Sequence, residues 1–287
     1  MDLKDIEVTV PSVSEWFTLR FFGDQHVGAE ASHRKLMLKV INEIKADPEY
    51  TRAILMGDPC DCIIPSDKKW GGVMALDPRL RDHLDNIPNM QKKFFVDDVE
   101  PIKDQLWFAL RGNHDNWMPS RHSNDISLEI CKELGVELLS QVVQMRIRVK
   151  DLKGRSYRVR GVVSHAEKGS ITPQGKRAAV GKLAEQYPNV DFFALAHTHG
   201  YLAEEEPYND VVGSWGNPRY VDKKKWLFLT GGFLKNYGLG YTTYSERKGY
   251  APVKLGSPYI RMRQERTSVA SGTHGGKSVD KTVLEGF

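Results

Sequence analysis

The sequence LWFALRGNHD, residues 106–115, decides how the chain is interpreted. Its first half is a short apolar run of the length expected of a buried β-strand. Its second half places an amide, an imidazole and a carboxylate directly after Gly112, and glycine allows the backbone to turn sharply and to approach its neighbours closely. The segment therefore predicts a buried strand that carries polar side chains at its carboxyl end.

Four other predicted strands end in the same way. Residues 16–22, 52–56, 157–164 and 191–196 are apolar or alternating runs, and each is followed by potential metal ligands: Asp24 and His26, Asp58, His165, and His197 and His199. In open α/β sheets, sites collect just outside the carboxyl ends of the strands. We therefore expect the five loops, including the one that carries Asn113, to meet in space.

The remaining pattern predicts an α/β domain over residues 1–263. Helices are expected at residues 32–45, 88–98, 124–134 and 174–186, a hairpin partner strand at 141–150, and late strands at 226–230 and 259–262. Residues 63–104 interrupt the strand series with prolines and mixed charge, and are predicted to form an insertion or cap. Residues 264–287 are polar and rich in Gly and Ser, which predicts a flexible tail.

Composition excludes several classes of protein. The chain has 287 residues, three cysteines and a formal net charge of +4. Three cysteines do not make a disulfide framework, and no stretch reaches the roughly 20 apolar residues that span a bilayer. The mixed acidic and polar N-terminus lacks the pattern of a signal peptide, so a cytoplasmic location without membrane association is expected. The mild positive charge allows a nucleic-acid partner without requiring one.

The candidate ligands combine imidazole, carboxylate and amide oxygen. This mixture suits Mn, Fe or Zn better than Ca or Mg. Two such ions about 3.5–4 Å apart can hold a phosphate group and generate hydroxide at neutral pH. Each short motif alone is weak, because an isolated Asp-x-His or His-x-His is usually incidental. Their order and their shared position at strand ends are hard to obtain by chance.

The full series of motifs resembles the calcineurin-like metallophosphoesterases, including their phage-type and bacterial members, over about residues 16–234. The motifs are Asp24-x-His26, Gly57-Asp58-x-x-Asp61, Gly112-Asn113-His114-Asp115, His165 and His197-x-His199. The resemblance implies a four-layer αββα sandwich, with two mixed β-sheets flanked by helices. It also implies two divalent ions, with Mn²⁺ favoured over Fe and Zn, and hydrolysis of phosphate monoesters or diesters by a metal-bound hydroxide.

The same resemblance implies a role for each residue. One metal would be held by Asp24, His26, Asp58 and His199, and the other by Asp58, Asn113, His165 and His197, with Asp58 as the bridge. His114 would be the general acid that protonates the leaving group, and Asp61 would orient His114. Imidazole suits the role of general acid because it exchanges protons near neutral pH.

The chain departs from the family pattern at three places. Ala196 stands where the last motif usually begins with glycine, and Ala166 follows His165 where many relatives have glycine. Alanine is small, so we expect the ligands of the last motif to survive Ala196, and we expect Ala166 to alter how closely the substrate approaches the metal held by His165. Cys62 and Ile63 follow Asp61 in place of the Arg-Gly of the Ser/Thr protein phosphatases, which argues against a protein phosphatase.

The sequence leaves two questions open. The phosphoester substrate is either a small molecule, such as a nucleotide, or nucleic acid, as in the nucleases of the family. The alternative to an enzyme is a non-catalytic metal-binding or scaffold protein on the same fold. The oligomeric state is not indicated by any motif.

Overall fold

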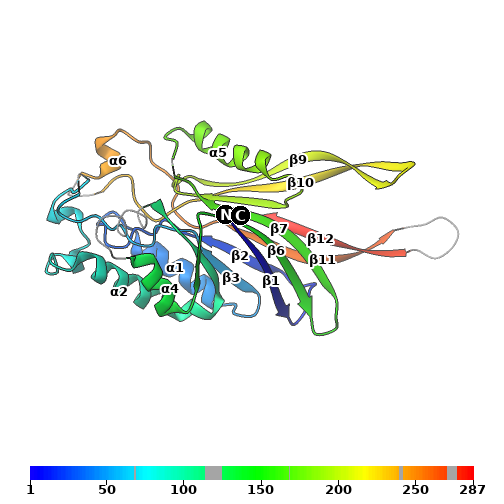
Figure 1. The fold of residues 1–287 in the computed structure, drawn as a ribbon, viewed down its shortest axis with the longest axis horizontal. Helices are drawn as coiled ribbons and strands as arrows, with labels where there is room; N and C mark the ends of the chain where they lie inside the picture. The colour runs from blue at the N-terminus through cyan, green and yellow to red at the C-terminus, as the bar shows by residue number, and fades with distance from the viewer. Residues whose placement is uncertain (68, 114–124, 168, 239–241, 270–276) are drawn as a thin grey trace.

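The computed structural model describes residues 1–67, 69–113, 125–167, 169–238, 242–269 and 277–287, and Figure 1 shows two stacked β-sheets with helices on their outer sides. Both sheets are mixed and have six strands. The four-layer αββα sandwich expected from the sequence is confirmed.

The first sheet contains the strands that lead to the candidate ligands His165, His197 and His199. Its order is β1 (Asp2–Val10), β6 (Val142–Asp151), β7 (Ser156–His165), β8 (Phe192–Ala196), β10 (Asn217–Thr230) and β9 (Tyr201–Ser214). β7 and β8 are parallel neighbours, so the loops that follow them leave the same edge of the sheet.

The second sheet contains the strands that lead to the other candidate ligands, Asp24, His26, Asp58 and Asn113. Its order is β12 (Lys277–Gly286), β11 (Tyr259–Val269), β2 (Phe17–Phe22), β3 (Thr51–Leu55), β4 (Leu106–Leu110) and β5 (Glu137–Leu139). β2, β3 and β4 run parallel to one another. Their carboxyl ends therefore also lie at one edge.

The main hydrophobic core fills the space between the sheets. Successive residues of a strand point to opposite faces, so Phe17, Leu19 and Phe21 of β2 enter this core. The ring of Phe21 lies 5.7 Å from that of Phe192 and 5.0 Å from that of Phe228, both of which belong to the opposite sheet. Burying each such ring contributes about 1.5–3 kcal/mol, and these rings hold the two halves of the site at a fixed separation.

Helices cover the outer faces of both sheets. α1 (Arg34–Lys45), α2 (Ile87–Val99) and α4 (Ile126–Leu134) pack on the sheet that contains β3, and α5 (Pro173–Gln186) packs on the sheet that contains β8. α1 buries Met37, Val40, Ile41 and Ile44, which is the spacing of one helix face. The short α6 (Tyr244–Arg247) and the 3₁₀ helices η1 (Val73–Ala75), η2 (Pro78–Leu80) and η3 (Glu100–Gln105) lie in connecting segments.

The flexible tail expected at residues 264–287 is replaced by β-structure in the part that the structure describes. Within residues 264–287, the described part continues β11 and then forms β12, which pairs antiparallel with β11. The ring of Phe287 stacks on Tyr259 at a centroid distance of 5.1 Å, and the guanidinium of Arg261 lies 4.4 Å from the same ring. These contacts give a polar segment enough buried surface to order it. The proposed domain boundary at residue 263 falls inside β11.

Two hairpins extend from the body of the molecule. Figure 1 shows β9 and β10 projecting to one side, beside β11 and β12. Only the last part of β10 was expected as a strand, at residues 226–230. No helix in the part of the chain that the structure describes is long and apolar enough to cross a membrane.

Candidate metal centre

The expected ligands come together where the strands of the two sheets end. Asp24 and His26 follow β2, Asp58 follows β3 and Asn113 follows β4, while His165 ends β7 and His197 and His199 follow β8. The loops stay hydrogen-bonded to each other beyond the strands. The N–H of Asp24 donates to the carbonyl of Gly57 at 3.0 Å, and the N–H of His26 donates to the carbonyl of Asp58 at 3.2 Å.

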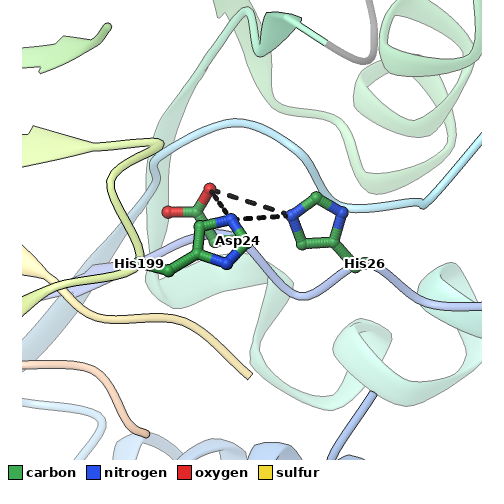
Figure 2. A group of neighbouring side chains, drawn as sticks. All are labelled: Asp24, His26 and His199. Carbon is green, nitrogen blue, oxygen red and sulfur yellow. Dashed lines mark hydrogen bonds and ion pairs between the residues drawn. The ribbon is translucent and has the colours of Figure 1, made fainter. Parts of the chain in front are cut away.

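Asp24, His26 and His199 form the first group. Figure 2 shows the two imidazoles turned toward each other beside the carboxylate. The Nε2 atoms of His26 and His199 are 3.1 Å apart, and Asp24 Oδ1 lies 3.5 Å from His199 Nε2 and 4.0 Å from His26 Nε2. Two lone pairs and one carboxylate oxygen directed at the same point are the donors that a single divalent cation binds.

Among the described residues, one of the two carboxylate oxygens of Asp24 accepts a hydrogen bond. It is fully buried, and its Oδ2 accepts a hydrogen bond from the N–H of His197 at 3.0 Å. Its buried Oδ1 has no hydrogen-bond partner among the described residues. Burial alone would raise the pKa of Asp24, but the neighbouring imidazoles of His199 and His165 together outweigh burial and hold the pKa below its ordinary value. A buried, ionised oxygen of this kind requires a cation.

Asp58, His165 and His197 form the second group, with Asn113 beside them. Nε2 of His165 lies 3.3 Å from Asp58 Oδ2 and 3.1 Å from Asn113 Oδ1. Nδ1 of the same ring lies 2.7 Å from the carbonyl oxygen of Met56. A carbonyl only accepts, so Nδ1 carries a proton there and Nε2 is directed at the site. This is the arrangement that orients a metal-binding histidine.

Opposite pKa shifts within the second group show how strong its internal field is. Burial would lower the pKa of His165, but the charge and hydrogen bond of Asp58, together with the charge of Asp24 and the carbonyl of Met56, outweigh burial and raise the pKa to about 9. The pKa of His197 falls to about 4, because that ring is buried and faces the positive charge of His165. A cation at Nε2 of His165 would take the place of the proton that the ring otherwise holds.

Backbone strain is concentrated on the candidate ligands. Among the described residues, seven that are not glycine have positive φ, and five of those seven are Asp24, His26, Asp58, His197 and His199, with φ between 47° and 74°. A left-handed conformation costs roughly 1–2 kcal/mol for such residues. Strain of this kind gathers at functional sites, where surrounding structure holds side chains in one direction.

Gly57 allows the two sheets to meet at the site. Its φ is +92°, and a Cβ placed on it would lie 2.5 Å from Nδ1 of His165 and 2.9 Å from Cα of Gly112. Any side chain there would push apart the ends of β3, β4 and β7. The close approach explains why glycine precedes both Asp58 and Asn113 in the sequence.

The residues present fit two divalent ions. The two groups supply three ligand atoms each from Asp and His side chains, and the ligand atoms of a group all lie within 4.8 Å of one another. The groups adjoin, because Asp24 of the first group binds the backbone of His197 of the second. The arrangement fits a dinuclear site, as the sequence predicted, and Asn113 is placed to add an amide oxygen to the second group.

His114 was expected to act as the general acid and Asp61 to orient it. His114 lies outside the described residues, so its role stays a prediction. Asp61 Oδ1 lies 3.4 Å from Nδ1 of His26, which places Asp61 behind a ligand of the first group. Whether Asp61 also orients His114 stays a prediction.

A cavity of about 650 Å³ opens over the site. Its lining includes Asp58, His26, His197 and His199, together with Trp70 from the segment that was expected to form a cap. Several lysines and arginines also line it. The sequence did not identify these cations, because they come from separate elements and share no motif.

Comparisons with known proteins add little. No protein-family profile matches the chain, and no curated protein matches its sequence. Several solved structures are similar at low identity, and three of them are as follows. Vps29 of Chaetomium thermophilum is 11% identical with a TM-score of 0.35, and 93% of this chain and 96% of that chain are covered. Calcineurin-like phosphoesterase YfkN of Bacillus subtilis is 10% identical with a TM-score of 0.38, and the covered shares are 95% and 91%.

The third structure is the C. thermophilum Vps29 complexed with the RaPID-derived cyclic peptide RT-D3. It is 8% identical with a TM-score of 0.25, and 94% of this chain and 96% of that chain are covered. Likeness at these TM-scores carries no argument about this chain. The resemblance to the calcineurin-like metallophosphoesterases rests on the seven candidate ligands and on the strand ends that bring them together.

Proposed function

We propose that the chain is a phosphoesterase that depends on two divalent metal ions and hydrolyses phosphate monoesters or diesters. The observation that carries the proposal is the pair of adjoining three-ligand groups at the floor of one cavity. Two bound ions would activate water and neutralise the charge of a phosphate group. Mn²⁺ is the first candidate, with Fe and Zn next, since the donors are mixed oxygen and nitrogen.

The residues of the chain would hold this machinery in place. Asp24, His26, Asp58 and His199 would bind one ion, and Asp58, Asn113, His165 and His197 the other. The carbonyl of Met56 keeps Nε2 of His165 directed at the site, and Asp61 stands behind His26. His114, next to the ligand Asn113, would give a proton to the leaving group.

The segment of residues 63–104 would help to select the substrate. Within it, Trp70, Gly71, Ala75 and Leu76 line the cavity. Gln91 of α2 supports the loops beneath, because its side chain accepts a hydrogen bond from the N–H of Cys62 at 2.9 Å. The segment therefore touches both the opening and the base of the site, as a cap that reads the substrate would.

Turnover tests the proposal. Purified protein supplied with Mn²⁺ should hydrolyse p-nitrophenyl phosphate or bis-p-nitrophenyl phosphate, and Asp58→Asn should abolish the activity. The control is Asp222→Asn, which changes an exposed carboxylate on β10 that does not line the cavity. If wild type binds two ions but turns over no ester in a panel of monoesters, diesters and oligonucleotides, the chain is a non-catalytic metal-binding protein instead.

A further inference from the structure

The wall of the cavity carries positive charge that the carboxylates of the described residues neutralise only in part. Six cations line it: Lys69, Lys176, Arg177, Lys235, Arg247 and Lys254. Arg177 forms ion pairs with Glu204 and Glu206 at 3.0 and 2.7 Å. Within the described residues, none of the other five forms an ion pair with a carboxylate. The carboxylates in the described lining are Asp58 and Asp61, which belong to the metal centre.

Two of these cations lie against Gly200 and Tyr201, the residues that directly follow His199 of the first group. Lys176 is in the first turn of α5 and is half-buried, and its Cδ would lie 3.0 Å from a Cβ placed on Gly200. Its stem therefore crosses the backbone directly after His199. The ring of Tyr201, the residue after Gly200, contacts the second cation: Nζ of Lys254 lies 3.7 Å from its centre.

Their position is costly without an anion. Two ammonium groups near a centre that would bind divalent cations repel those ions, and the partial burial of Lys176 weakens the screening by water there, whereas Lys254 is exposed. An anion between them and the metals would offset both effects. The phosphate that reacts would itself sit on the metals, so the lysines are left for a second anionic group.

The remaining lining favours a small molecule over a polymer. Trp70, Ile171 and Tyr250 give the cavity aromatic and apolar walls, and a volume of about 650 Å³ is typical of small-molecule sites. A nucleic-acid strand would instead need cations spread along an open surface.

We propose that Lys176 and Lys254 form a second anion subsite, which binds an additional phosphate of a small phosphoester while the metals hold the phosphate that reacts. The inference rests on the proposed function and narrows its substrate class to small molecules with two phosphate groups and an apolar or aromatic part. Lys176 contacts the substrate, and it takes no part in the proton transfer.

Binding of simple anions tests the subsite without turnover. Calorimetry on protein supplied with Mn²⁺ would measure affinity for pyrophosphate and for phosphate. Wild type should prefer pyrophosphate by about tenfold or more, and Lys176→Met should remove most of that preference, with a further loss when Lys254→Met is added. Lys182→Met is the matched control, because Lys182 is an exposed lysine on the same helix. An equal preference in wild type and Lys176→Met would overturn the subsite.

Turnover of a matched pair of esters tests the substrate class. Thymidine 5′-(p-nitrophenyl phosphate) is compared with the same compound carrying a 3′-phosphate. Lys176→Met should raise KM about tenfold for the 3′-phosphorylated compound only, with kcat unchanged. If anion preference depends on Lys176 but no ester is hydrolysed, the proposed function fails and the subsite stands. Tighter, Lys176-dependent binding of a single-stranded oligonucleotide would overturn the small-molecule conclusion.

Discussion

Asp58 contacts both ligand groups. Its carbonyl accepts the N–H of His26 from the first group, and its Oδ2 lies 3.3 Å from Nε2 of His165 in the second. It is fully buried and holds a φ of +50°. A strained, buried residue that contacts one group through its backbone and the other through its carboxylate is suited to bridge two cations, which the family resemblance also implies.

Asp58→Asn should lower the metal content for both ions. An amide keeps the shape of the side chain but removes its charge, so two cations at the close spacing of such sites, about 3.5–4 Å, would repel each other with nothing between them. Elemental analysis after reconstitution with Mn²⁺ should give about two ions per chain for wild type and less than one for the variant. Two ions in the variant would show that Asp58 is not the bridge.

His114→Asn should distinguish the role of a general acid from the role of metal binding. The ligands are untouched, so metal content should stay near that of wild type. Turnover of alkyl or sugar esters should fall by roughly 10²–10⁴-fold, the usual range for a positioned acid. Nitrophenyl esters should lose less, since their leaving group hardly needs a proton. Equal losses on both classes would assign His114 to phosphate binding instead.

Gly57→Ala should destabilise the chain by more than the strain of its backbone alone. A positive φ costs alanine roughly 1–2 kcal/mol, and overpacking against His165 and Gly112 adds about 1–3 kcal/mol. Gly154→Ala is the control, because Gly154 has φ +82° and no atom within 4 Å of a Cβ placed there. Denaturant unfolding should show a clearly larger loss for Gly57→Ala. Equal losses would mean that the close approach at Gly57 is not needed.

Local patterning decides which elements the sequence reveals. Buried strands such as β3 and β4 and amphipathic helices such as α1 carry their signal in their own residues, and the predicted positions are confirmed to within a few residues. β1 was not predicted, because its charged residues become favourable only through its partner. Asp5 pairs with Arg146, and Glu7 pairs with Arg148 and Lys150, all on β6. Such pairing depends on a register that one strand cannot reveal.

Removal of residues 277–287 should lower the melting temperature. The truncation deletes Phe287, which stacks on Tyr259, and Leu284, which packs against the core between the sheets. Loss of these contacts costs about 2 kcal/mol or more, equivalent to roughly 4–8 °C for a chain of this size. Calorimetry would measure the shift, with Phe287→Leu as a milder variant that removes only the ring. An unchanged melting temperature would restore the expectation of a loose tail.

At the scale of the whole molecule, the grouping of the candidate ligands was predictable and the cavity was not. The seven candidate ligands sit in short motifs, and parallel strands bring their carboxyl ends together. The cavity wall combines Lys176 from α5 with Lys235 and Lys254 from the segment after β10. Only the packing of the two sheets and the connecting segments places these cations around one volume, so no pattern along the chain marks them.

The outer part of the β9–β10 hairpin projects from the body of the molecule (Figure 1). Beyond Glu206 and Lys225 its strands pair only with each other, and Val211, Trp215 and Tyr220 are more than 60% exposed. No residue from 207 to 224 lines the cavity in the described structure. Replacing residues 207–224 by Asn-Gly joins the paired residues Glu206 and Lys225 through a two-residue turn of a type that suits hairpins.

This shortened chain should keep the melting temperature of wild type to within about 2 °C, together with its metal content and turnover, because the deleted residues bury little surface against the body. Leu227→Ala is the contrasting variant. Leu227 lies in the buried half of β10, and its truncation should cost about 2–5 kcal/mol. Calorimetry on the two proteins would decide whether the hairpin belongs to the cooperative unit. A loss on deletion as large as that of Leu227→Ala would show that the projecting strands stabilise the fold, and that their exposed aromatic side chains are covered in solution.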